Sequence, residues 1–207
     1  MSITKEQIIL SLYQTVCTLS DSIGLKEAYT PKHQHDVAHL ARTIGQVMNL
    51  DKEVIDGLRI GAMLHDFGIV RIPTDILNKA EKLTEQEFEI MKQHPVHGYQ
   101  ILKGIDFPWP VGRMILQHHE RLDGSGYPGG IRGDDIILEA RIIGVADIIQ
   151  SMISDRPWRK ALPLEVALAE LKKYRGTKYD PAVVDACVEI YTRQPDLLKP
   201  AHYGRGS

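Results

Sequence analysis

The sequence from Asp51 to Gly68 reads DKEVIDGLRIGAMLHDFG, and this stretch decides the fold. Apolar residues recur in it every three or four positions, which is typical of an amphipathic α-helix with one buried face. That face ends at the adjacent pair His65-Asp66, and Gly68 is the expected helix terminator. The residues that define the face are Val54, Leu58, Ala62 and His65. The stretch therefore predicts a helix that carries a polar pair into the protein interior.

Helical periodicity also dominates the rest of the chain, and no stretch alternates in the manner of a β-strand. Thr84 followed by Glu87 matches a capping box, and five glycines between Gly124 and Gly133 indicate a shaped loop. We expect helices over residues 4–20, from Thr30-Pro31 onward, and over 84–94, 109–119, 138–153, 164–174 and 181–193, with a new helical turn that starts at Pro95 after a junction at His94. The predicted fold class is all-α, in a single helical domain.

Five histidines and two aspartates lie at the inward-facing ends of these helices. A buried imidazole or carboxylate is costly without a partner, so the set requires a common explanation. Metal ions supply one, because imidazole and carboxylate ligands without thiolate suit iron, manganese or zinc. Seven ligands are too many for one tetrahedral zinc ion and suit two ions that keep open positions. The candidate ligands are His33, His65, Asp66, His94, His118, His119 and Asp147.

The simplest division of these ligands lets one carboxylate serve both ions. One set is His33, His65, Asp66 and Asp147, and the other is Asp66, His94, His118 and His119. Asp66 is then the bridging residue, and two ions roughly 4 Å apart share a hydroxide that attacks phosphorus in line. The sequence thus predicts metal-assisted hydrolysis of a phosphoester.

Taken singly, these residues also have ordinary structural interpretations. An inward His33 alone is more often a hydrogen-bonded core histidine, and Asp147 alone would suit a buried partner of a nearby base. Only the joint pattern favours metal ions. The other histidines, His35, His39, His97 and His202, are interpreted as surface or supporting residues.

Composition excludes several classes of function. The formal net charge of the 207 residues is −2, which does not indicate a binder of nucleic acid polymers. Cys17 and Cys187 lie far apart without CxxC spacing, as expected of core thiols in a reducing compartment. The chain shows neither a signal sequence nor a membrane-spanning run, so we expect a cytoplasmic protein without membrane contact.

The chain is expected to divide into three parts. Residues 1–28 are predicted to form an N-terminal helix, either accessory or part of the core. Residues 29–195 form the main domain. Residues 196–207 are an unstructured tail whose final GRGS resembles a vector remnant.

Four stretches of the main domain occur in an order that is specific to one family. They read LHDFGIVRIPTDILNKAEKLTEQEF, MKQHPVHGYQIL, QHHERLDGSGYPGG and ARIIGVADIIQSMISDRPWRKA. From about Thr30 to Val183 the chain resembles the HD-GYP subgroup of the HD phosphohydrolase superfamily. The resemblance implies an HD-type helical domain with a Gly-rich GYP loop and two or three metal ions, usually iron or manganese. It also implies hydrolysis of the bacterial messenger cyclic di-GMP.

The resemblance further assigns candidate substrate contacts. Arg156 and Arg159 match cations that contact phosphate, a role suited to the guanidinium fork. Tyr127 belongs to the Gly-Tyr-Pro signature, and Trp158 stands where tyrosine is usual and could stack on a base. Packing is the alternative for both aromatics, and solvated charge for both arginines. The resemblance also implies that the GYP loop contacts partner GGDEF domains. The helix before Tyr29 is a candidate element for forming a homodimer.

Three positions depart from the family pattern. Ile69 replaces a lysine associated with the substrate phosphate, and Arg71 two residues later is a candidate replacement. Tyr29 stands where members with three metals carry a glutamate ligand, so two metal ions are predicted. Gln150 stands where an aspartate often occurs, which would alter a hydrogen bond behind the ligands.

The leading prediction is a metal-dependent phosphodiesterase that hydrolyses a cyclic dinucleotide, cyclic di-GMP. One alternative is a non-catalytic signalling domain that binds metal and nucleotide, which the loss of the lysine at Ile69 favours. The other alternative keeps the enzyme but gives an HD phosphohydrolase that acts on another small phosphoester.

Overall fold

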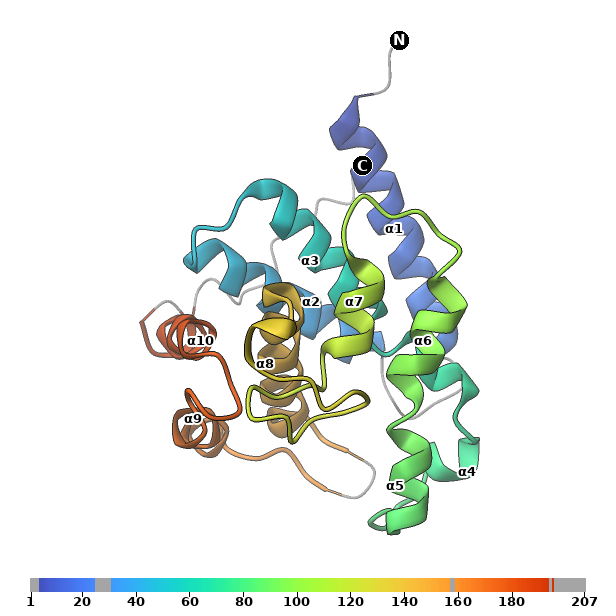
Figure 1. Ribbon diagram of the computed structural model, residues 1–207, viewed down its shortest axis with the longest axis vertical. Coiled ribbons are helices and arrows are strands. Elements are labelled where there is room, and N and C mark those ends of the chain that lie inside the picture. The colour runs from blue at the N-terminus through green and yellow to red at the C-terminus, as the bar shows by residue number, and fades with distance from the viewer. Residues whose placement is uncertain (1–3, 25–30, 157–158, 194, 196–207) are drawn as a thin grey trace.

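The protein is built from helices wound around one apolar core (Figure 1), and the computed structural model describes residues 4–24, 31–156, 159–193 and 195. Within these residues the only paired backbone segments are two isolated bridges, Arg156–Arg159 and Arg175–Tyr179. The helices are α1 (Lys5–Gly24), α2 (Pro31–Val47), α3 (Lys52–Leu64), η1 (Phe67–Arg71), α4 (Thr74–Leu77), α5 (Glu85–Met91), α6 (His94–Leu102), α7 (Val111–Gln117), η2 (Gly133–Asp135), α8 (Leu138–Ile153), α9 (Leu164–Lys173) and α10 (Pro181–Arg193). The all-α prediction is confirmed.

The core lies where α2, α3 and α8 pack together, with α9 and α10 on one side of α8 (Figure 1). These central helices bury large aliphatic side chains completely, which is the main source of their stability. Such residues include Leu40 and Ile44 on α2, Leu58 on α3, and Ile142 and Ile149 on α8. The inward faces of the same helices carry the polar cluster, so the core positions the site.

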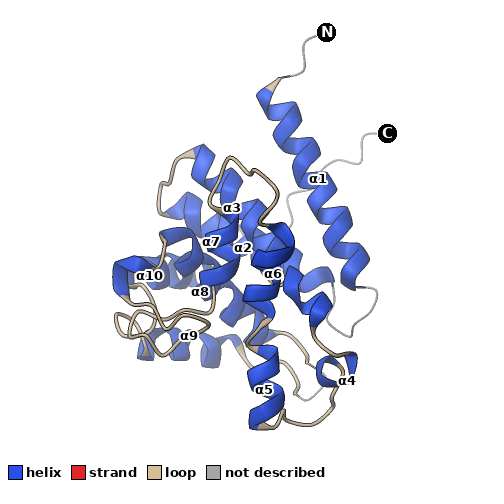
Figure 2. Cartoon of the chain, turned by 45° about the vertical axis from the view of Figure 1, so that its right-hand side comes forward, coloured by secondary structure: helices blue, strands red, loops and turns tan. Residues whose placement is uncertain are grey.

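The helix α1 buries residues completely only in its second half, although Ile9, Leu12 and Tyr13 in the first half are partly buried against the core. Val16 is buried in the second half, and the Ser20 hydroxyl lies 3.0 Å from Gln34 Oε1 and 3.2 Å from the Met63 carbonyl oxygen. Ile8 in the first half is 58% exposed, and Figure 2 shows that half extending beyond the other helices. The helix therefore contributes mainly its second half to the core, and the domain boundary at residue 28 stays a prediction.

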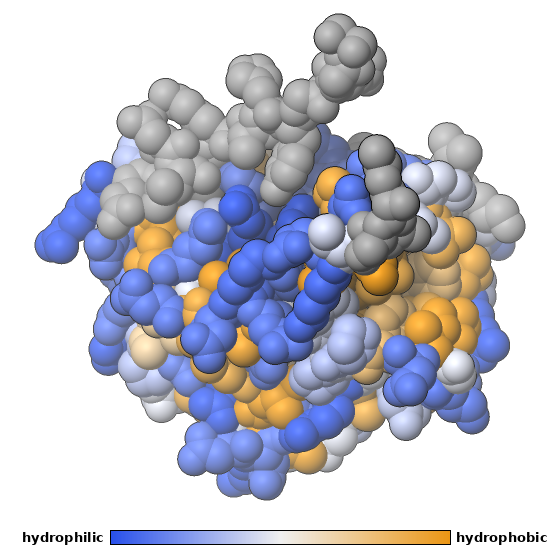
Figure 3. All heavy atoms as spheres, turned by 90° about the horizontal axis from the view of Figure 1, so that it is seen from above, coloured by the Kyte–Doolittle hydropathy of each residue, from blue (hydrophilic) through white to orange (hydrophobic). Residues whose placement is uncertain are grey.

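The surface is mixed in character. Seen from above in Figure 3, apolar residues reach the surface in patches between hydrophilic ones. Among the described helices, none combines the length and apolar character needed to cross a membrane.

The sequence placed most helices well but misjudged several of their ends. The helix expected to reach His94 ends earlier, at Met91, and the new helical turn expected after His94 is α6, which begins at His94 itself. The helix expected over 109–119 ends at Gln117, so His118 and His119 follow it rather than belong to it. The capping box is confirmed: Thr84 Oγ1 accepts from the Glu87 amide at 3.2 Å, and Glu87 Oε2 accepts from the Thr84 amide at 2.7 Å.

Gly68 does not terminate α3, which ends earlier at Leu64. It lies in η1, where the backbone passes against α6 without room for a side chain. A Cβ atom at this position would lie 1.9 Å from the His94 carbonyl oxygen and 2.4 Å from the Gly98 amide nitrogen. The glycine therefore permits a close backbone approach that holds the segment after His65-Asp66 against the start of α6.

We predict that Gly68→Ala lowers the free energy of unfolding by at least about 2 kcal/mol, because the new methyl group meets backbone that has no rotamer to change. Chemical denaturation measures the change. Gly104→Ala is the matched control, since a Cβ there has no neighbour within 4 Å. Equal unfolding midpoints for the two variants would contradict the close approach.

Candidate metal centre

The seven candidate ligands come from separate segments and meet at one place. His33 lies on α2, His65 and Asp66 directly follow α3, and His94 begins α6. His118 and His119 directly follow α7, and Asp147 lies on α8. All are buried except His119, which is half-buried. The fold thus brings together every ligand that the sequence proposed, while their roles as ligands stay a prediction.

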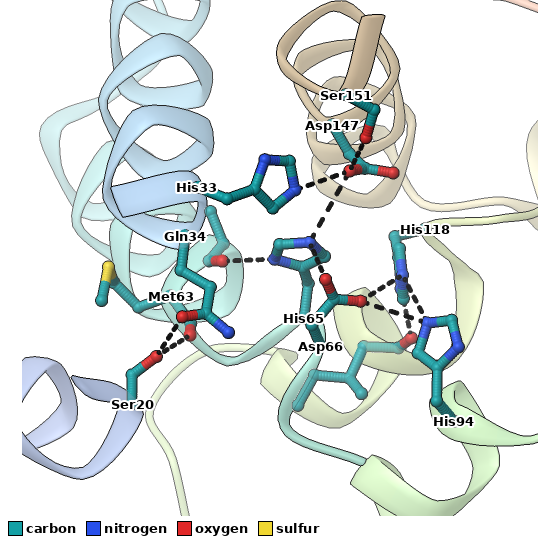
Figure 4. A network of polar contacts seen from close by, with 12 residues as sticks. Ser20, His33, Gln34, Met63, His65, Asp66, His94, His118, Asp147 and Ser151 are labelled. Carbon is teal, nitrogen blue, oxygen red and sulfur yellow. Dashed lines mark hydrogen bonds and ion pairs between the residues drawn. The ribbon is translucent and has the colours of Figure 1, made fainter. Parts of the chain in front are cut away.

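Asp66 lies at the middle of the cluster, as Figure 4 shows. Its Oδ2 atom is 3.2 Å from His65 Nε2, and its Oδ1 atom is 3.3 Å from His94 Nε2 and 3.9 Å from His118 Nε2. Each carboxylate oxygen therefore faces a different group of imidazoles. A single carboxylate with this placement can contact two cations at once.

Asp147 completes the side of the cluster formed by α2 and α8 (Figure 4). Its Oδ1 atom lies 3.1 Å from His33 Nε2 and 3.9 Å from His65 Nε2. The Ser151 hydroxyl, one turn further along α8, donates to the same oxygen at 3.1 Å. Asp147 is thus oriented from two sides.

Backbone carbonyls fix the orientation of three of the imidazole rings. His65 Nδ1 lies 2.6 Å from the Ala62 oxygen, His94 Nδ1 2.8 Å from the Met91 oxygen, and His118 Nδ1 2.6 Å from the Ile115 oxygen. Each partner is the third residue before the histidine. Since a carbonyl only accepts, each Nδ1 carries a hydrogen, so Nε2 is the atom through which each ring, once it has lost its second proton, can bind a cation.

This arrangement fits metal ions well. His94 Nε2 and His118 Nε2 lie 3.3 Å apart, so two lone pairs face each other unless a cation or proton lies between them. The ligand atoms of Asp66, His94, His118 and His119 all lie within 4.8 Å of one another, as do those of His33, His65 and Asp66. Asp66 is common to both groups, which coincides with the division proposed from the sequence.

The charges in the cluster are strongly coupled. Burial alone would lower the pKa of His65, but the charge and hydrogen bond of Asp66, together with Asp147, raise that pKa to about 9. Burial and the neighbouring imidazoles lower the pKa of His118 to about 3. Despite burial, His65 and His94 hold the pKa of Asp66 well below its usual range, and His33 and His65 do the same for Asp147. Both carboxylates are therefore anionic at neutral pH and suited to cations.

The GYP loop closes over His119. The Tyr127 ring stacks on the His119 ring with centroids 4.6 Å apart and an interplanar angle of 26°. The Tyr127 amide donates to the His119 carbonyl at 3.2 Å. Glu120 holds the far side of the loop, because its Oε1 atom accepts from the amides of Gly129 at 2.6 Å and Gly130 at 3.2 Å. The loop is therefore a support for a candidate ligand as well as a wall of the site.

A cavity of about 320 Å³ opens over the cluster. Asp66, His94, His119 and Asp147 line it, and Tyr127, Ser151, Arg156 and Arg159 line its polar side. Arg156 Nη2 donates to Ser151 Oγ at 2.6 Å, which links this guanidinium through Ser151 to Asp147. Arg159 donates to three backbone carbonyls, those of Ser151, Met152 and Lys160. Both cations predicted from the resemblance are thus anchored beside the cluster.

Arg71 does not line the cavity, and its role as a replacement for the lysine stays a prediction. The tight turn of η1 directs Ile69 into the cavity wall and leaves Arg71 exposed, where its Nη1 atom donates to Gln100 at 3.2 Å. Gln150 donates to the Tyr191 hydroxyl on α10 at 3.2 Å, a contact between helices of the core. The predictions for Tyr29 and Trp158 lie outside the described residues.

Sequence reasoning missed several residues of the site. Glu120 directly follows the histidine pair, and its position was the available signal, but only the folded loop shows that its carboxylate binds two glycine amides. Ser151 lies four residues after Asp147, so helical spacing was a signal for that contact. The apolar lining residues Leu77, Leu83, Phe88 and Met91 gave no signal as site residues.

We predict that Glu120→Ala loosens the GYP loop and costs about 1–3 kcal/mol of stability, because two amides in part-buried hydrogen bonds lose a charged acceptor. Hydrogen exchange at Gly129 and Gly130 measures the local effect, and denaturation the global one. Glu120→Gln keeps an acceptor oxygen and is therefore expected to lose less stability than Glu120→Ala. Unchanged amide protection in Glu120→Ala would show that the loop is held by other contacts.

Comparison with known proteins agrees with this geometry. Residues 17–183 match the HD domain family. The chain is 40% identical over 175 residues to the cyclic di-GMP phosphodiesterase response regulator RpfG of Xanthomonas campestris, covering 84% of this chain and 46% of that protein. It is 37% identical over 190 residues to a cyclic di-GMP phosphodiesterase of Thermotoga maritima, covering 91% and 52%. The chain thus spans about half the length of these curated relatives.

A solved structure shares the fold. The crystal structure of a cyclic GMP-AMP specific phosphodiesterase from Vibrio cholerae matches with a TM-score of 0.70 over 92% of this chain and 51% of that chain, at 18% identity. The chain belongs to the HD domain family and carries the sequence motifs of its HD-GYP subgroup.

Proposed function

We propose that this chain is a metal-dependent phosphodiesterase that hydrolyses a cyclic dinucleotide, with cyclic di-GMP as the first candidate. The observation that carries the proposal is the Asp66 carboxylate, which faces imidazoles on both sides at the base of a cavity. The names of the two curated relatives support the choice of cyclic di-GMP.

Each part of the cluster has a proposed task. Asp66 bridges two divalent ions, iron or manganese, which suit a set rich in imidazoles and carboxylates. The other six ligands divide as the two groups in the cluster do, with Asp147 on the side of His33 and His65. When bound, such ions lower the pKa of a shared water and neutralise charge on the phosphoryl oxygens.

The chain's own residues bind and orient the substrate. Arg156 and Arg159 provide positive charge on the polar side of the cavity, where guanidinium groups match phosphate oxygens. Tyr127 covers His119 and limits water on that side. These contacts would hold one phosphodiester over the Asp66 carboxylate in the orientation that in-line displacement requires.

The deciding experiment incubates metal-loaded protein with cyclic di-GMP under anaerobic conditions and follows linear products by chromatography. We expect Asp66→Asn to lower kcat by more than about 100-fold, beyond the effect typical of residues behind the ligands. His35→Ala is the control, because His35 contacts Asp21 outside the cluster. If fully loaded wild type is as inert as Asp66→Asn towards cyclic di-GMP, a panel of cyclic dinucleotides and small phosphoesters decides whether the protein is an enzyme at all.

A second candidate function is a signalling domain that binds metal and nucleotide without turnover. Ile69 favours it, because this position presents an apolar side chain to the cavity where the family has a lysine. Calorimetric binding of cyclic di-GMP without product would support this alternative, and measurable turnover would exclude it as the sole role.

Metal binding has a consequence for stability. Free Mn²⁺ at 100 times its Kd should add about 2.7 kcal/mol to the free energy of unfolding, because only the folded protein forms the site. Calorimetric melting with and without a chelator measures the gain. Asp66→Asn should lose most of it, and Ca²⁺ should substitute poorly, since the cluster is rich in nitrogen. The same gain in wild type and Asp66→Asn would overturn the bridging role.

Three predictions extend beyond the site. They are contact of the GYP loop with a partner GGDEF domain, a homodimer, and a cytoplasmic location. The exposed Phe88 next to Tyr127 is compatible with a partner at the loop, and each of the three stays a prediction.

A further inference from the structure

The helix α5 buries none of its residues, although it carries large apolar side chains. Phe88 is 46% exposed and Ile90 is 42% exposed. Polar contacts fix the start of the helix instead, namely the capping box and the ion pair between Lys79 Nζ and Glu87 Oε2 at 2.7 Å. The apolar side chains of α5 therefore contribute little to the stability of the core.

The cavity explains where part of this apolar surface is used. Five residues, Ile69, Leu77, Leu83, Phe88 and Met91, line it, and we call them the apolar wall. The wall residues lie on η1, α4, α5 and the segment between α4 and α5, all before His94 in the chain, whereas Arg156 and Arg159 follow α8. One cavity thus combines an anionic and imidazole base, a cationic side and an apolar side.

Such a division matches the two parts of a nucleotide. Phosphate oxygens suit the arginines and the cations that the cluster would hold, while a nucleobase presents a flat face that stacks on aromatic rings. Phe88 is the aromatic residue of the wall, and its ring lies edge-to-face with Tyr127 at 6.4 Å and 79°. The two rings form a corner of the cavity lining, and Lys92 Nζ lies 5.3 Å from the centre of the Phe88 ring.

We propose that the apolar wall is the binding site for one nucleobase of the substrate and that Phe88 is the residue on which this base stacks. The inference rests on the proposed function, since it presumes a nucleotide in the cavity. The volume of about 320 Å³ lies at the small end of the range for ligand sites, which suits one nucleotide unit better than a whole cyclic dinucleotide.

The wall also gives Ile69 a positive role. A lysine at this position would place a charge beside the base, whereas isoleucine extends the apolar surface from α5 towards Asp66. Binding at this side of the cavity therefore depends on stacking and apolar contact, and binding at the other side depends on charge.

The test compares the affinities of 5′-GMP and inorganic phosphate for the metal-loaded protein by calorimetry, which requires no turnover. Phe88→Ala should weaken the binding of 5′-GMP on the order of fivefold to a hundredfold, the range seen when a stacking residue is removed. Its phosphate affinity should change less than twofold. Phe88→Tyr keeps an aromatic face and should retain 5′-GMP affinity. Ile90→Ala is the matched control, because Ile90 is as exposed on α5 but does not line the cavity.

The outcomes separate the two proposals. The proposal that the apolar wall binds a nucleobase is overturned if Phe88→Ala and Ile90→Ala bind 5′-GMP equally well. It is also overturned if Phe88→Ala loses affinity for phosphate in parallel, or if the wild type binds phosphate more tightly than 5′-GMP. Turnover of cyclic di-GMP by wild type is measured alongside. If turnover is absent while Phe88→Ala selectively loses 5′-GMP, the catalytic proposal fails and the base site stands. If turnover is present and Phe88→Ala leaves 5′-GMP affinity unchanged, only the base site fails.

Discussion

The structure depends on one buried carboxylate whose two oxygens contact imidazole rings on opposite sides. Asp66 lies within 3.2–3.3 Å of His65 and His94, which come from the ends of different helices. An ionised group is stable in such a place only when opposite charges and hydrogen bonds offset the hydration that it loses. The helices α2, α3, α6 and α8, together with the residues after α7, therefore have to meet at one point. The core around Leu40 and Ile142 brings them there.

The second level of organisation is the backbone itself. Three histidines bind the carbonyl of the third residue before them, so a helix end both presents the ring and fixes its tautomer. The ring of His119 is oriented by a loop instead of a helix end. His119 has the Tyr127 ring stacked on it, and Glu120 holds that loop through two glycine amides. Main-chain carbonyls thus orient three of the seven candidate ligands, whereas side chains orient His119 and Asp147.

Short-range sequence patterns predicted the helix cap, the helix extents and the buried faces, because interactions between residues near in sequence control them. The capping box at Thr84, the extent of α8 and the inward face that ends at His65 all follow from short-range spacing, and the joint set of seven polar residues revealed the cluster. Contacts between distant segments could not be predicted in this way. The role of Gly68 depends on where α6 passes, and the different directions of Ile69 and Arg71 depend on a tight turn in place of a helix. Glu120 required the folded loop, because its partners lie nine and ten residues away.

The helix α5 has a consequence for how such proteins diverge. Because none of its residues is buried and polar contacts fix its start, its apolar side chains are decoupled from the folding of the domain. Substitutions at Phe88 or Met91 reshape the cavity at little cost to the core, whereas substitutions at the histidines and aspartates disturb the whole convergence of helices. Evolution can therefore vary the lining of the cavity while the buried polar cluster stays fixed.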